Sequence, residues 1–200
     1  MNKKITIAID AMGGENAPEK NIEGLGIFFR KTQPKDLVVN LYGDERILKE
    51  QLIKHKILNK SVNIIHTDSI VSDEETPLTA IKNSKNTSMW NSVRAQIDGE
   101  ADISLSAGNT GVLLVISRMI LKTMKEVSKP ALAGLWPSKK GMSVVLDLGA
   151  NIECDEKNLI DFSEMGAALY KSIFPNQKPN VSLLNIGSEE IKGTEVIKKA

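Results

Sequence analysis

The sequence has few of the residues that build disulfides and metal sites. Its 200 residues include one cysteine, Cys154, and two histidines, His55 and His66. One cysteine cannot close a disulfide within the chain, and the sequence has no C-x-x-C or H-E-x-x-H spacing. We therefore expect no structural disulfide and no metal site. The cysteine usage and the polar N-terminus MNKKITIAID, which does not resemble a signal peptide, predict a cytoplasmic protein.

An excess of charge of one sign is also missing. Lys and Arg together number 26, Asp and Glu number 25, and the formal net charge is +1. This balance gives no bulk attraction to nucleic acid or to an acidic membrane surface. Apolar runs are short as well: the run from Val112 to Ile116 is soon followed by Arg118, whereas a membrane-spanning helix needs roughly 18 apolar residues. We expect neither a polyelectrolyte ligand nor a membrane span.

Short β-branched runs alternate with longer stretches of helical period along the chain. This βαβα rhythm predicts an α/β fold of three layers, α/β/α, with a mostly parallel sheet. No linker or repeat interrupts it, so we expect a single domain over residues 1–200. The expected strands are residues 5–9, 37–42, 62–66, 102–106, 143–148 and 181–186, with residues 130–137 either an edge strand or an extended crossing. The expected helices are residues 19–32, 45–55, 77–97 with a break, 110–125 and 157–174.

Four turns rich in small residues each follow the carboxyl end of an expected strand. They are DAMGG at 10–14, SAGNTG at 106–111, DLGAN at 147–151 and NIGSEE at 185–190. The carboxyl ends of parallel strands lie along one edge of a sheet, where ligands bind. We therefore expect these turns to line one site. Their candidate ligand-binding residues are Asp10, Gly13, Gly14, Ser106, Gly108, Asn109, Thr110, Gly111, Asp147 and Asn151.

The SAGNTG turn leads directly into a helix expected to start near Thr110. Backbone N–H groups at a helix start have no partner inside the helix, and the helix dipole favours an anion there. Asn109 or Thr110 can cap this helix, and Ser106 and Thr110 can add hydroxyl donors. The alternative is an ordinary turn between strand and helix, in which glycine and capping residues are common. No G-x-G-x-x-G or G-x-x-x-x-G-K-[ST] motif is present, so no nucleotide cofactor is predicted.

Several reactive side chains each allow two interpretations. Asp10 and Asp147 end apolar strands, where a carboxylate can orient a substrate, hold a metal or, as we favour, pin a loop by accepting backbone N–H bonds. Cys154 lies near the expected ligand edge, but its acidic neighbours do not favour a thiolate nucleophile. Lys85, with nearby Ser88, and Lys192, which follows the fourth turn, either face an anionic substrate or are solvated.

Taken together and in this order, several strings resemble the phosphate acyltransferase (PlsX) family of bacterial phospholipid synthesis. The matching strings are IAIDAMGGENAPE, KNTSM, SAGNTG, KPAL at 129–132, VVLDLGANIEC and LLNIGSEEIKG. The resemblance implies a Rossmann-like fold, a homodimer, and transfer of an acyl group from acyl carrier protein to inorganic phosphate. The acyl phosphate product is then used by a membrane glycerol-phosphate acyltransferase.

The resemblance also implies roles for particular residues. Lys192 aligns with the family's catalytic lysine, and the DAMGG turn together with Asn109, Thr110 and Gly111 is placed to bind phosphate. Lys85 aligns with a more basic family segment that faces phosphate or the acidic carrier protein. Family members usually continue well beyond the equivalent of Ala200, through a D-G-F-x-G-N turn and a segment for dimerisation and peripheral membrane contact.

Two further hypotheses stay open. Because the 200 residues carry only the first half to two-thirds of the family pattern, the chain is either an active enzyme or an inactive remnant that binds anions or a partner subunit. A phosphotransacetylase-like enzyme is the other alternative. Dependence on coenzyme A thioesters would favour it.

Overall fold

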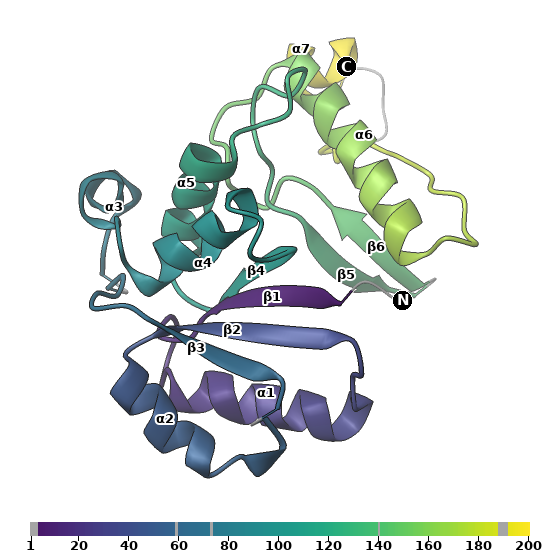
Figure 1. The fold of residues 1–200 in the computed structure, drawn as a ribbon. Helices are drawn as coiled ribbons and strands as arrows, with labels where there is room; N and C mark the ends of the chain where they lie inside the picture. Colours follow the sequence, from purple (N-terminus) through teal and green to yellow (C-terminus); the bar gives the residue numbers. More distant parts are fainter. Residues whose placement is uncertain (1–3, 59, 73, 140, 188–191) are drawn as a thin grey trace. The chain divides into compact units, whose positions relative to one another are not determined.

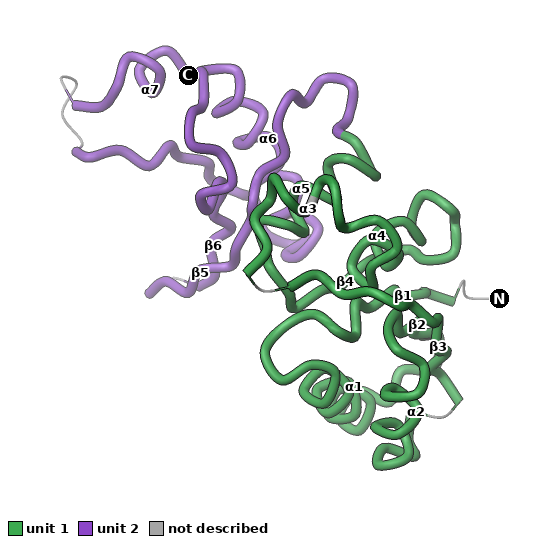
Figure 2. Tube along the Cα trace, turned by 90° about the vertical axis from the view of Figure 1, so that its left-hand side faces the viewer, with its two compact units in different colours: residues 1–122 green, residues 123–200 purple. Residues whose placement is uncertain are grey.

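The computed structural model describes residues 4–58, 60–72, 74–139, 141–187 and 192–200. The chain divides into two compact units, residues 1–122 and residues 123–200 (Figure 2). The described strands form a four-stranded sheet in the first unit and a two-stranded sheet in the second. The single continuous domain expected from the sequence stays a prediction.

The first unit is built on a parallel sheet. Its strands are β1 (Ile5–Asp10), β2 (Leu37–Gly43), β3 (Val62–His66) and β4 (Ile103–Ser106). They lie in the order β3-β2-β1-β4, and every neighbouring pair is parallel (Figure 1). Each strand end agrees with the expected one to within one residue. The register sets Asp10 opposite Ser106 at the carboxyl ends of β1 and β4.

Helices cover both faces of this sheet, which confirms the expected α/β fold (Figure 1). They are α1 (Glu19–Thr32), α2 (Glu45–Ile53), the short 3₁₀ helix η1 (Lys56–Leu58), α3 (Pro77–Asn83), α4 (Ser88–Ile97) and α5 (Thr110–Leu121). The core follows the alternation of β1. Ile9 packs in one cluster with Ile22 and Phe29 of α1, whereas Ala8 packs in another with Ala95 of α4.

The break expected within residues 77–97 falls between α3 and α4. Asn86 has a φ of 68°, a left-handed conformation through which a helix does not continue. Thr87 then starts α4, because its side chain accepts the Trp90 N–H at 3.2 Å. The next helix, α5, ends at Leu121 instead of residue 125, since Lys122 has a φ of 61°.

The strand β4 lies at an edge of the described sheet and is poorly covered on one face. Its register with β1 places Ile103 and Leu105 on the face that carries Ile7 and Ile9. Ile9 is buried in the core cluster that includes α1, but Ile103 is 52% exposed and Leu105 is 56% exposed. At the β4 edge of the sheet, these two apolar side chains are therefore left exposed to solvent.

The second unit contains an antiparallel strand pair and a long helix. The strands β5 (Gly134–Ser138) and β6 (Gly141–Val145) pair with each other, and the helices are α6 (Glu156–Ile173) and α7 (Glu195–Lys199). The strand β5 shows that the ambiguous stretch 130–137 contains a strand. At the start of α6, the Asp155 side chain accepts the Asn158 N–H, so a capping box fixes the first turn.

The strand expected over residues 181–186 is wrong. These residues belong to the described part of the chain, and they form no ladder with any described strand. Their apolar side chains Val181, Leu184 and Ile186 are exposed. A β-branched run favours extended backbone, but a strand forms only where a neighbouring strand supplies hydrogen-bond partners and a face to pack on.

Candidate functional site

The first two small-residue turns come together at the carboxyl edge of the parallel sheet. Because β1 and β4 are neighbours, the turns that follow Asp10 and Ser106 start side by side. The Ser106 hydroxyl donates to Asp10 Oδ2 at 2.8 Å and accepts the Gly108 N–H at 3.1 Å. A short hydrogen-bonded chain therefore links the end of β1 to the backbone of the second turn.

Glycine is required where the two turns touch. A Cβ atom at Gly13 would lie against the Asp10 carboxylate and 3.1 Å from the Gly108 nitrogen. A Cβ at Gly108 would lie 2.9 Å from the Met89 methyl group and 3.3 Å from the Gly13 Cα. Gly14 has a φ of 101°, which L residues with side chains rarely adopt. The glycines predicted from the sequence thus let two backbones approach each other closely.

Asn21 holds the first turn in place from α1. Its side-chain amide donates to the carbonyl oxygens of Ala11 at 3.0 Å and Gly13 at 2.9 Å. Sequence reasoning did not identify this residue. The sequence contains one indication of its role: an asparagine lies in the first turn of the helix that follows DAMGG, although helix interiors do not favour this residue type.

Asn109 is the residue that caps α5. Its Oδ1 accepts the Val112 N–H at 3.1 Å, and its Nδ2 donates to the Glu75 carbonyl at 3.1 Å. Thr110 and Gly111 follow as the first helical residues, with Gly111 close to the ring of Pro77. The cap fixes the direction in which the first N–H groups of the helix point, as an anion site requires.

Two buried polar atoms beside these turns have no hydrogen-bond partner among the described residues. They are Asp10 Oδ1 and Ser88 Oγ, and each residue is 1% exposed. Ser88 opens α4 and precedes Met89, the residue that packs against Gly108. Burying a polar atom without a partner costs free energy, so such atoms in a native structure require an explanation.

Lys85 is exposed in the turn between α3 and α4, three residues before Ser88. Among the described residues, no hydrogen bond or ion pair fixes its amine on the protein. The first unit therefore brings together Asp10, Gly13, Gly14, Ser106 and Gly108, with Asn109, Thr110 and Gly111 directly after them.

The other three predicted residues, Asp147, Asn151 and Lys192, lie in the second unit. Asp147 accepts backbone N–H bonds from Leu132 at 2.8 Å, Ala150 at 3.2 Å and Asn151 at 2.7 Å. Burial raises the pKa of Asp147, but these hydrogen bonds outweigh it and hold the pKa below its usual value. This is the loop-pinning role favoured from the sequence.

Lys192 follows the fourth turn, of which residues 188–191 lie outside the described residues. Its side chain is exposed, and its carbonyl oxygen accepts a hydrogen bond from Asn185 Nδ2 at 3.4 Å. Gly193 comes next, with a φ of 93°, and a Cβ atom added there would lie against the Asn185 side-chain amide. Asn185 therefore holds the backbone at Lys192, whose side chain is exposed.

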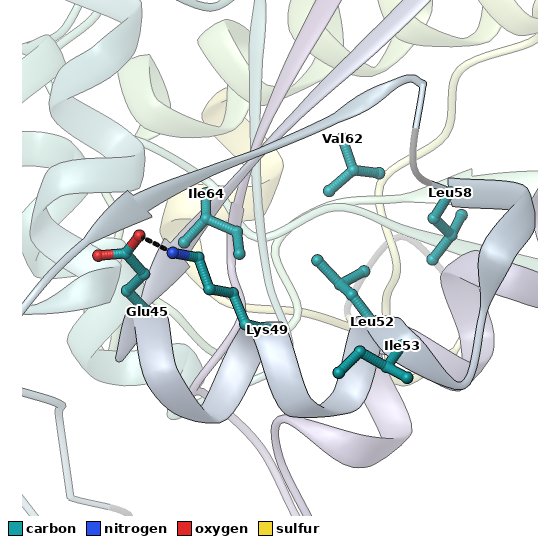
Figure 3. A pocket seen from close by; sticks show the side chains of 7 residues that line it. All are labelled: Glu45, Lys49, Leu52, Ile53, Leu58, Val62 and Ile64. Carbon is teal, nitrogen blue, oxygen red and sulfur yellow. Dashed lines mark ion pairs between the residues drawn. The ribbon is translucent and has the colours of Figure 1, made fainter.

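Elsewhere in the first unit a hollow of about 570 Å³ lies between α2 and β3 (Figure 3). Its lining is mostly aliphatic, and Lys49 is paired with Glu45 across one end. It contains none of the predicted site residues. In the described part of the chain, no group of three or more His, Cys, Asp or Glu side chains is placed to hold a metal ion. Among the described helices, none is long and apolar enough to cross a membrane.

The fold and the paired turns define an α/β protein whose candidate site lies at the carboxyl edge of a parallel sheet. Residues 5–200 match the family described as "Fatty acid synthesis protein", and the chain belongs to this family. The finding confirms the family resemblance seen in the motifs.

Curated relatives of this chain carry the name phosphate acyltransferase. The one from Pelagibacter ubique is 49% identical over 199 residues, which are 100% of this chain and 59% of the relative. The one from Bradyrhizobium diazoefficiens is 43% identical and the one from Maricaulis maris 37% identical, and the chain spans 56% of each. The chain therefore spans just over half the length of these relatives.

A solved structure has a similar fold. The phosphotransacetylase EutD from Staphylococcus aureus superposes with a TM-score of 0.63 over 94% of this chain and 59% of its own. Its sequence is 17% identical, so the likeness concerns the arrangement of strands and helices. It supports the α/β architecture described above.

Proposed function

We propose that this chain carries the phosphate-binding half of an acyltransferase that makes acyl phosphate from an acyl-acyl carrier protein and inorganic phosphate. The main support for this proposal is the pair of glycine turns that meet beside the start of α5. The chain is also up to 49% identical to relatives named phosphate acyltransferase. A phosphate oxygen attacks the thioester carbonyl carbon, the C–S bond breaks, and the carrier protein leaves with its thiol.

The first unit supplies the phosphate site in this proposal. The first-turn N–H groups of α5 and the Thr110 hydroxyl bind the phosphate oxygens, and the turn at Gly13 and Gly14 lets the anion approach the backbone. Phosphate itself is the nucleophile, so no protein nucleophile is required. Catalysis then consists of positioning and of stabilising charge that develops in the transition state.

Two lysines have roles in the proposed reaction. Lys192 stabilises the tetrahedral oxyanion or the leaving thiolate, which suits an exposed side chain whose backbone carbonyl is held by Asn185. Lys85, also exposed, attracts phosphate or the acidic surface of the carrier protein. Asp147 and Asn151 support the loop that their hydrogen bonds hold.

The assay is phosphate-dependent release of the carrier thiol from an acyl-acyl carrier protein. We expect Lys192→Ala to lower the rate by roughly 100-fold or more, the size of effect that removal of one oxyanion-stabilising group has. Lys198→Ala is the matched control, because Lys198 is a nearby lysine that pairs with Glu195 on α7. A Lys192→Ala rate close to that of the Lys198→Ala control would contradict the assignment.

The second candidate function is that of an inactive remnant, which stays open from the sequence. The chain alone then binds phosphate and a partner subunit without turnover. Phosphate binding without any thiol release would support this alternative. In the full enzyme we propose a cytoplasmic homodimer with peripheral membrane contact, whose product passes to a membrane glycerol-phosphate acyltransferase.

A further inference from the structure

The carboxylate of Asp10 lies beside the proposed anion site, although a negative charge there does not favour anion binding. It lies against Gly13 and receives the Ser106 hydroxyl, beside the turn that leads into α5. A carboxylate repels an anion, and at this depth solvent screens the repulsion poorly. The burial of Asp10 therefore has to be reconciled with phosphate binding at the same edge.

The two oxygens of this carboxylate have different surroundings. Oδ2 accepts the Ser106 hydroxyl at 2.8 Å, which fixes the plane of the carboxylate from the neighbouring strand. Oδ1 is buried and has no partner among the described residues. A carboxylate oxygen accepts hydrogen bonds and cannot donate them. Asp10 Oδ1 therefore lacks a hydrogen-bond donor.

A protonated oxyanion supplies that donor. Phosphate near neutral pH keeps at least one O–H group, and arsenate has the same chemistry, whereas sulfate keeps none. We propose that Asp10 is a specificity-determining residue that accepts a hydrogen bond from a protonated oxyanion at Oδ1 and so selects phosphate or arsenate over sulfate. The proposal rests on the proposed function only in taking the paired turns as the phosphate site.

The remaining contacts are consistent with this selection. The helix start of α5 attracts any oxyanion, so it cannot by itself separate phosphate from sulfate. The Gly108 N–H is already bound by Ser106, and Asn109 Oδ1 is occupied by the Val112 N–H. Asp10 Oδ1 is thus an acceptor. The phosphate O–H donates a hydrogen bond to it, whereas sulfate has no donor and its charge is repelled by the carboxylate.

The experiment measures binding of phosphate, arsenate and sulfate to the full chain by isothermal titration calorimetry. One hydrogen bond to a charged group, gained with phosphate and lost with sulfate, predicts a preference of roughly 10- to 100-fold for phosphate. Arsenate is expected to bind like phosphate. Equal affinity of the unmodified chain for phosphate and sulfate, or no binding of phosphate, would overturn the proposal without any variant.

Asp10→Asn is the test variant, because an amide keeps the shape of the carboxylate and adds a donor. We expect this variant to bind sulfate more tightly and phosphate more weakly than the unmodified chain does. The ratio of its phosphate affinity to its sulfate affinity should then fall to within a few-fold of one. Asp102→Asn, at the amino end of β4, is the matched control and should keep the preference of the unmodified chain. An Asp10→Asn variant with the native circular dichroism spectrum and an unchanged preference would contradict the proposal.

The two proposals fail separately. Selective phosphate binding without thiol release contradicts the acyltransferase function of this chain and leaves the role of Asp10 intact. Phosphate-dependent thiol release by a chain that binds sulfate as tightly as phosphate contradicts the role of Asp10 alone. Both assays use the same purified protein.

Discussion

At the scale of single residues, Asp10, which ends β1, and Asp147, which follows β6, have different surroundings. Asp147 has its carboxylate oxygens taken up by N–H groups of Ala150 and Asn151 in its own loop and of Leu132, 15 residues earlier. Asp10 accepts one hydroxyl and keeps a buried oxygen without a described partner. The sequence favoured the same loop-pinning role for both. Local sequence did not separate them, because the partner of Asp10 comes from a strand 96 residues away.

Asp147 gives a prediction about stability and pH. Asp147→Ala leaves three backbone N–H groups without their acceptor, and we expect the second unit to lose about 2 kcal/mol of unfolding free energy at neutral pH. Because the folded pKa lies below the ordinary 3.8, the carboxylate stabilises the fold above that pH. This contribution is lost as pH falls from 3.8 through the folded pKa.

Urea unfolding at neutral and acidic pH measures this effect. A Trp90→Phe background leaves Trp136, on β5 of the second unit, as the one tryptophan in the sequence. The difference between Asp147→Ala and its parent should shrink on acidification below 3.8. A difference that is the same at both pH values would show that the carboxylate charge does not stabilise the loop.

At the scale of helices and strands, local signals predicted most of the first unit. Asn109, one of the two caps expected for α5, accepts an N–H of the first turn, and Thr87, a typical capping residue that was not predicted as a cap, does the same for α4. The strand expected over 181–186 failed because a strand depends on a neighbour that the local sequence does not specify. Helix ends are local features of the chain, whereas strand pairing is not.

The Asn109 cap carries the prediction at this scale. Asn109→Ala removes the acceptor for the Val112 N–H, and we expect a loss of about 1 kcal/mol in the unfolding free energy of the first unit. Asn109→Ser keeps an acceptor oxygen and should recover most of this loss. Trp90 fluorescence in a Trp136→Phe background reports the unfolding of this unit. Equal losses for the alanine and serine variants would contradict a capping role.

At the scale of the whole molecule, the edge strand β4 exposes two apolar side chains on one face of the sheet. Ile103 and Leu105 continue the apolar face of β1 on an edge strand, and edge strands readily pair with other chains. We expect the purified chain to self-associate as its concentration rises. The double variant Ile103→Thr/Leu105→Thr should lower this association, because threonine keeps β propensity and removes apolar area.

Sedimentation velocity over a wide range of concentrations measures this association. Leu78→Thr is the control, since Leu78 is an exposed leucine on α3 that lies outside the sheet. It should associate like the unmodified chain. A chain that stays monomeric at every concentration would show that β4 is not a site of self-association.

The hydrogen bond between Ser106 and Asp10 closes a loop of 96 residues, and the two glycine turns touch only when that loop is closed. The proposed phosphate site therefore does not exist in the unfolded chain. By thermodynamic linkage, an anion that binds this site and is present at a free concentration of 100 times its Kd adds about 2.7 kcal/mol to the unfolding free energy of the first unit. In the proposed enzyme, the supply of phosphate and the stability of the folded protein in the cell are therefore one coupled equilibrium.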